Sequence, residues 1–89
     1  MIRASILVHG KVQGVFFRAS AKSKADELGI VGYARNKPDG TVEIVAEGTK
    51  KHLEQFLVFC KSGPNLASVT KVDVSFSDAT NEFSGFSVE

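Results

Sequence analysis

The sequence predicts an α+β fold in which two helices cover one face of an antiparallel sheet. The chain has 89 residues, enough for one two-layer core and too few for two. Stretches in which apolar and polar side chains alternate, as in strands, are separated by two stretches in which apolar side chains recur at helical spacing. Glycine and proline residues stand at most of the junctions between them. We therefore expect residues 1–89 to form a single domain.

The first half of the chain predicts a strand, a helix and a hairpin. Residues 2–9 alternate as expected for a strand that is covered on one face. The helix that follows has apolar side chains at helical spacing: Phe17, Ala21, Ala25 and Leu28. Gly29 is suited to end it in a left-handed conformation. Residues 30–36 and 41–47 are then the two strands of a hairpin, because the segment between them contains Pro38 and Gly40, which favour a turn.

The second strand of this hairpin has a clear inner and outer face. Three apolar side chains are expected to point inward: Val42, Ile44 and Ala46. The alternate side chains are expected to point outward, away from the core: Thr41, Glu43, Val45 and Glu47.

The second half of the chain adds a helix and a strand. Thr49 is a suitable N-cap, and Gly63-Pro64 ends the helix. The apolar stripe of this helix consists of Leu53, Phe56, Leu57 and Cys60. A fourth strand is marked by Val72, Val74 and Phe76, and residues 83–88 form a short strand or an extended tail. The order strand, helix, strand, strand, helix, strand predicts a ferredoxin-like βαββαβ sandwich with strand order 4-1-3-2.

Composition limits the classes of function. A formal net charge of +1 argues against a protein that coats nucleic acid. The single cysteine cannot form an internal disulfide, and no apolar run is long enough to span a bilayer, so we expect a cytoplasmic protein without a membrane partner. Residues 1–25 contain five basic side chains and no acidic one, which would draw an anion to this part of the chain.

The centre of this basic segment is a loop bracketed by glycines, running from Gly10 to Arg18. Gly10 and Gly14 can take positive φ and allow an anion to approach the main chain. The N–H groups of such a loop and of the helix that follows lack partners within the chain, so they can converge on a phosphate. Arg18 lies in the first helical turn, where a guanidinium can bind two phosphate oxygens. The segment therefore predicts a phosphate-binding loop.

Two motifs resemble those of the acylphosphatase family: GKVQGVFFR at residues 10–18 and GYARNKPDGTVE at residues 32–43. The resemblance implies a hydrolase that cleaves the carboxyl–phosphate bond of small acyl phosphates without a metal, a cofactor or a covalent intermediate. It assigns catalytic roles to Arg18, which binds the phosphate, and Asn36, which positions the attacking water. The phosphate-binding amides are those of Gly10, Lys11, Val12, Gln13, Gly14, Val15 and Phe16. Inorganic phosphate is then both product and competitive ligand.

Alternative roles remain for several residues. A non-catalytic, phosphate-binding ferredoxin-like module would use the same loop, whereas an RNA-binding sheet would need exposed aromatic residues and a signature that the sequence lacks. His9 is expected to be a hydrogen-bonded structural residue rather than a general base, and Cys60 a buried apolar side chain. We expect a monomer that does not bind nucleic acid. The sequence does not identify the physiological acyl group.

Overall fold

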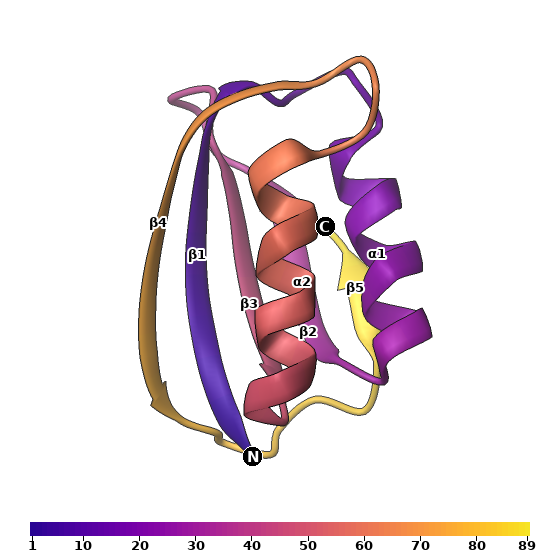
Figure 1. Cartoon of the computed structure of the whole chain (residues 1–89), viewed down its shortest axis with the longest axis vertical. Helices are drawn as coiled ribbons and strands as arrows, with labels where there is room; N and C mark the ends of the chain where they lie inside the picture. Colours follow the sequence, from indigo (N-terminus) through magenta and orange to yellow (C-terminus); the bar gives the residue numbers. More distant parts are fainter.

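Two helices cover one face of a five-stranded sheet in the computed structural model, which describes residues 1–89 (Figure 1). The strands are β1 (Ile2–Lys11), β2 (Val31–Asn36), β3 (Val42–Gly48), β4 (Ser68–Asp78) and β5 (Phe86–Val88), and the helices are α1 (Phe17–Leu28) and α2 (Lys50–Ser62). Neither helix has the length and apolar character needed to cross a lipid bilayer.

The sheet order is β4-β1-β3-β2-β5, which confirms the predicted order of the first four strands. The predicted terminal strand or tail is a strand, and it lies beside β2 in the parallel direction, so the sheet is mixed rather than wholly antiparallel. β1 and β4 are also longer than predicted, because β1 continues through Gly10 and Lys11 opposite Val69 and Ser68 after an irregularity in register. Gly10 is needed there, since a Cβ would lie 2.1 Å from the carbonyl oxygen of Ser68.

The core lies between the sheet and the helices, as the periodicity predicts. β1 and β3 contribute the inner side chains of their alternating pattern, all fully or almost fully buried: Ala4, Ile6, Val8, Val42, Ile44 and Ala46. The helices contribute Phe17, Ala21, Ala25, Leu53, Phe56 and Cys60. Both predicted caps are confirmed. Gly29 ends α1 with φ 71°, and the Thr49 hydroxyl accepts a hydrogen bond from the N–H of His52 at 3.2 Å.

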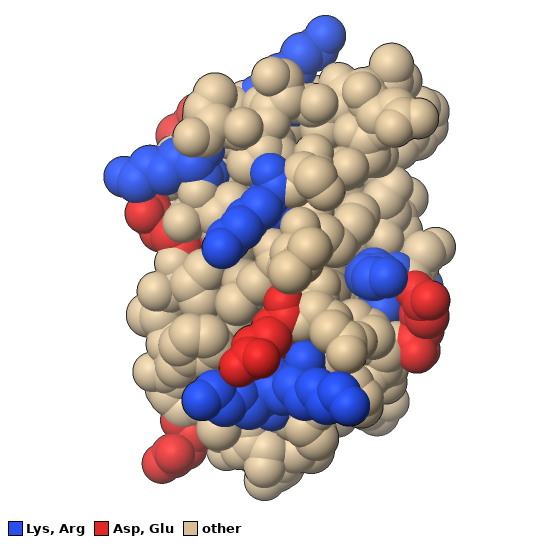
Figure 2. Space-filling view, viewed as in Figure 1, with Lys and Arg blue, Asp and Glu red and all other residues tan.

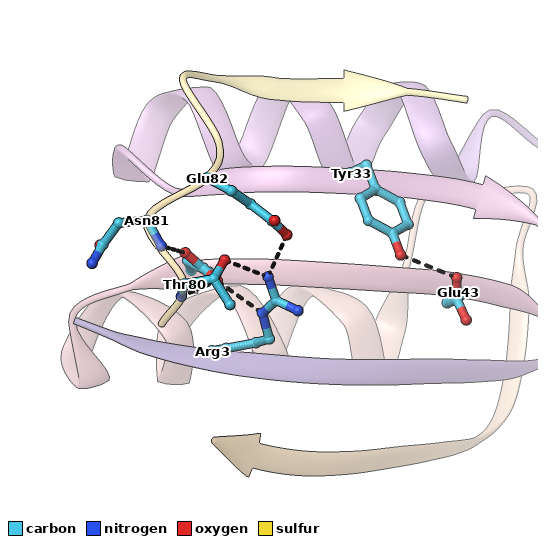
Figure 3. Close-up of polar contacts among 7 residues, drawn as sticks. Arg3, Tyr33, Glu43, Thr80, Asn81 and Glu82 are labelled. Carbon is cyan, nitrogen blue, oxygen red and sulfur yellow. Dashed lines mark hydrogen bonds and ion pairs between the residues drawn. The ribbon is translucent and has the colours of Figure 1, made fainter. Parts of the chain in front are cut away.

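The outward side of residues 41–47 is more covered than expected, because Thr41, Val45 and Glu47 are all buried there. Glu47 points to the sheet face opposite the helices but is completely buried. The segment with Thr80, Asn81 and Glu82 crosses that face (Figure 3), and Thr80 and Asn81 donate to the Glu47 carboxylate. Its carboxylate accepts hydrogen bonds from Arg3 Nε at 2.8 Å, from the N–H and hydroxyl of Thr80 at 2.9 and 3.1 Å, and from the Asn81 N–H at 3.1 Å. Burial alone raises the pKa of Glu47, but these hydrogen bonds outweigh it and lower the pKa to about 2.

The first prediction concerns this buried carboxylate. Glu47→Gln is expected to lower the free energy of unfolding at neutral pH by about 3 kcal/mol, since Arg3 and two main-chain donors lose a charged acceptor. The folded-state pKa lies below the ordinary 4.5, so this stabilisation is complete above about pH 4.5 and is lost as the pH falls toward 2. Urea unfolding at several pH values measures it, with exposed Glu54→Gln on α2 as the control. A difference between wild type and Glu47→Gln that does not shrink on acidification contradicts the assignment.

Candidate active site

The loop after β1, the first turn of α1 and the end of β2 meet at one end of the molecule. Figure 1 shows the β1–α1 loop and the β2–β3 turn at the end opposite the N terminus. A hollow of about 300 Å³ opens there and is lined by Val12, Gly14, Phe16, Phe17, Arg18, Ala19, Asn36 and Val88. Arg18 and Asn36, which the sequence places 18 positions apart, therefore face a common space.

The loop that borders this hollow presents unbonded main-chain donors. Gly14 and Phe16 both have left-handed backbones, with φ of 75° and 66°. The N–H groups of residues 12–16 donate to no main-chain or side-chain acceptor in the protein. Helix α1 begins here without a side-chain cap and without an acidic residue in its first turn, so its positive end also remains uncompensated. These groups are suited to bind an anion.

Gly10 and Lys11 lie outside this loop, in the paired end of β1. They belong to the predicted set of phosphate-binding residues, and the structure places them where the strand leads into the loop. The irregular run of the chain begins at Val12.

Arg18 is held in place from two directions. Phe17, directly before it, is buried and packs against Phe59 of α2 with ring centroids 5.7 Å apart, which fixes the first turn of α1. The Arg18 guanidinium donates through Nη1 to the main-chain oxygen of Glu89 at 2.6 Å, and the N–H of Glu89 donates to the Ala34 carbonyl at 2.9 Å. The segment after β5 thus connects Arg18 to the strand that ends in Asn36.

Asn36 is the last residue of β2 and its side chain is exposed. It pairs in register with Val42, whose side chain is buried under the helices, so Asn36 belongs to the helix-covered face of the sheet. Its carboxamide makes no hydrogen bond within the protein, which leaves both a donor and an acceptor free at the hollow. The neighbouring Arg35 points to the other face, where it pairs with Glu43.

Gln13 connects the loop to the turn that follows Asn36, a role that the sequence reasoning missed. Its side-chain Nε2 donates to the carbonyl oxygens of Lys37 and Thr41 at 2.8 and 2.9 Å. The sequence assigned only the main-chain N–H of Gln13 to the site. A polar residue between two loop glycines carries no local signal that its amide spans to a turn 24 residues away.

The second prediction tests this connection. Gln13→Ala is expected to lower kcat/KM for the acyl phosphate that the sequence motifs predict as substrate by about tenfold. Losing hydrogen bonds of this kind lets the loop move relative to Asn36. Gln13→Glu should be more damaging, since a carboxylate would face two carbonyl oxygens. Gln55→Ala, on the exposed side of α2, is the control and should match the wild type. If Gln13→Ala has the same kcat/KM as the wild type, Gln13 does not position the loop.

The other chemically active side chains lie elsewhere. His9 makes the predicted structural hydrogen bond, with its Nε2 2.9 Å from Asp73 Oδ2 on β4. Cys60 is buried, as predicted, and burial raises the pKa of its thiol to about 12, so it stays protonated. No three side chains of His, Cys, Asp or Glu come together in a way that could hold a metal ion.

A second, shallower groove of about 330 Å³ lies on the open face of the sheet, between Ser5, Leu7, Val45 and Ser75. Its acidic residues already have partners, since Glu43 pairs with Arg35 and Asp73 with His9. It lacks the free main-chain donors of the β1–α1 loop. We therefore take the hollow between Arg18 and Asn36 as the candidate active site.

The fold and this hollow define a small α+β domain with free main-chain donors at a helix N terminus, an arrangement suited to an anion. The family model for acylphosphatase matches residues 4–88. The acylphosphatase of Methylococcus capsulatus is 51% identical over 88 residues, covering 99% of this chain and 96% of the relative, and that of Thermus thermophilus is 55% identical over 78 residues, covering 88% and 89%. The crystal structure of acylphosphatase from Bacillus subtilis, 36% identical, superimposes with a TM-score of 0.96 over 100% of this chain and 99% of the other.

The chain belongs to the acylphosphatase family. It is a hydrolase whose substrates are acyl phosphates and whose product is inorganic phosphate, as the resemblance in the two sequence motifs predicts.

Proposed function

We propose that the N–H groups of residues 12–16 and the guanidinium of Arg18 bind the phosphoryl group of a small acyl phosphate, and that Asn36 positions the water that attacks it. The observation that carries this proposal is the common hollow: Arg18, Asn36 and the unbonded loop all border it. Gly10 and Lys11 contribute by ending β1 where the loop must start. The reaction needs no metal ion and no covalent intermediate.

The chemistry fits the residues at hand. The water oxygen forms a bond to phosphorus while the bond from phosphorus to the acyl oxygen breaks, and its electron pair leaves with the carboxylate. A carboxylate leaves without being protonated, so no general acid is required. Asn36 can accept a hydrogen bond from the water but is not basic enough to take its proton, which passes instead to a phosphate oxygen of the substrate. Binding, charge stabilisation and alignment are then the whole task of the protein.

Arg18 retains enough donors for this role. A guanidinium carries five N–H groups, and only one of its nitrogens contacts Glu89. The remaining N–H groups are free for the equatorial oxygens, where charge is spread in the transition state. Fixed donors of this kind stabilise that charge without having to reorganise.

The test is hydrolysis of benzoyl phosphate in an excess of chelator and in water enriched in ¹⁸O. We expect turnover, with the label in inorganic phosphate, because water attacks phosphorus. We also expect inorganic phosphate to compete with the substrate for the loop. Label in benzoate would show attack at the acyl carbon, and loss of turnover in chelator would show that a metal is needed. Either outcome overturns the proposed mechanism.

We further propose that the protein acts as a cytoplasmic monomer and that residues 1–89 fold as one domain. Its one cysteine is buried and free. Basic and acidic side chains are interspersed on the helix-covered side (Figure 2), an arrangement that does not favour a nucleic-acid backbone. Light scattering of the purified protein tests the oligomeric state, and we expect it to give the molar mass of a monomer.

A further inference from the structure

Phe16 has a conformation and an exposure that its place in the loop does not require. Its backbone is left-handed, with φ 66° and ψ 20°, and its side chain is 71% exposed. A left-handed residue at this point allows the loop N–H groups to converge, but glycine or asparagine adopts that conformation with less strain. A phenyl ring adds unfavourable contact with water as well. The backbone geometry therefore explains the positive φ and leaves the aromatic ring unexplained.

The position of the ring suggests its use. Phe16 lines the same hollow as Arg18 and Asn36, and Val88 lines it from β5. Val88 is 42% exposed, and neither residue packs into the core cluster. The rest of the lining is apolar or small apart from Arg18 and Asn36, so no acidic side chain and no second basic side chain borders the hollow.

We propose that Phe16 and Val88 bind the acyl part of the substrate, so that the enzyme favours acyl phosphates with an apolar, above all aromatic, acyl group over those with a small or charged one. This inference rests on the proposed function, because it requires the phosphoryl group to be held by the loop and Arg18. A phosphoryl group in that position leaves the acyl group to extend toward the mouth of the hollow. There it meets a phenyl ring and an isopropyl group that are exposed in the free protein, and covering them removes apolar surface from water.

The experiment compares kcat/KM for benzoyl phosphate and acetyl phosphate in the wild type and in three variants of Phe16 and Val88. Phe16→Asn removes the ring but keeps a residue that tolerates the left-handed backbone. It is expected to lower the ratio of kcat/KM for benzoyl phosphate to kcat/KM for acetyl phosphate by about tenfold, because the ring contacts only the larger acyl group. Phe16→Tyr keeps the ring and should retain the preference. Val88→Ser should reduce the preference by about threefold, since it removes a smaller apolar contact.

Phe76→Asn is the matched control. Phe76 is 56% exposed on β4 and does not line the hollow, so its replacement should leave the ratio of the two kcat/KM values unchanged. The inhibition constant of inorganic phosphate is measured for every variant, and we expect it to be the same in Phe16→Asn and the wild type. The inhibition constant reports on phosphate binding by the loop, separately from contacts of Phe16 and Val88 with the acyl group.

Two results overturn the inference while leaving the proposed function intact. One is that Phe16→Asn keeps the same ratio of kcat/KM for benzoyl phosphate to kcat/KM for acetyl phosphate as the wild type. The other is an equal fall for both substrates with weaker phosphate inhibition, which would show that Phe16 shapes the loop rather than binding the acyl group. If the wild type hydrolyses neither substrate, the proposed function fails and the inference fails with it.

Discussion

Arg18→Gln is expected to lower kcat/KM for benzoyl phosphate by about 10³-fold or more and to remove most of the binding of inorganic phosphate. The guanidinium is the only cationic side chain that lines the hollow, so its loss leaves the charge of the phosphoryl oxygens to the loop N–H groups alone. Arginine side chains that stabilise a transferring phosphoryl group contribute at least this much to the rate in other enzymes. Steady-state kinetics and a phosphate titration measure the two effects.

Glutamine keeps a side-chain N–H donor but not the charge, and its side chain is shorter than that of arginine. The contact of Arg18 with the main-chain oxygen of Glu89, 2.6 Å in the wild type, ties α1 to the segment after β5. Urea unfolding of Arg18→Gln and the wild type therefore separates the loss of charge from a loss of structure. Arg35→Gln is the matched control, because Arg35 lies on the opposite face of the sheet and outside the hollow. An Arg18→Gln variant with near wild-type kcat/KM would contradict the proposed site.

Asn36→Ala is expected to lower kcat by about 10²-fold while leaving the affinity for inorganic phosphate close to that of the wild type. The side chain has no hydrogen-bonding partner within the protein, so its removal costs the fold little. What the variant loses is the alignment of the attacking water, and misplacement of a reacting group has effects of this size. Kinetics with benzoyl phosphate, combined with inhibition by inorganic phosphate, distinguish loss of turnover from loss of binding.

Asn65→Ala provides the control for Asn36→Ala. Asn65 is exposed in the connection between α2 and β4 and does not line the hollow, so this variant should keep full activity. Full activity in Asn36→Ala would exclude the water-positioning role. A parallel loss of phosphate affinity would show instead that Asn36 contributes to phosphate binding.

Much of the fold follows from short-range signals. Alternation in residues 41–47 identifies β3, and Gly29 and Thr49 mark helix ends that the structure confirms. The nested order of strands and helices is enough to predict β1 as an interior strand between β4 and β3. The motif around Arg18 identifies the loop, and the order of elements brings it to the same end of the sheet as Asn36.

The contacts that complete the site could not be inferred in this way. Nothing in residues 83–89 indicates that β5 runs parallel to β2 or that Glu89 accepts a hydrogen bond from Arg18. The partners of the Gln13 side chain are likewise carbonyl groups, which every residue has, so residue type does not identify them. Residues 71 positions apart are brought together only by the packing of the whole sheet.

Glu47 shows the same division on the other face. The sequence by itself determined which face of β3 this side chain takes, because alternation is a local property of an extended backbone. Only the tertiary structure decided that the face is covered at Glu47, where Thr80 and Asn81 donate to a buried carboxylate. Periodicity sets the direction of a side chain, whereas its burial and its partners depend on which distant segment passes over it.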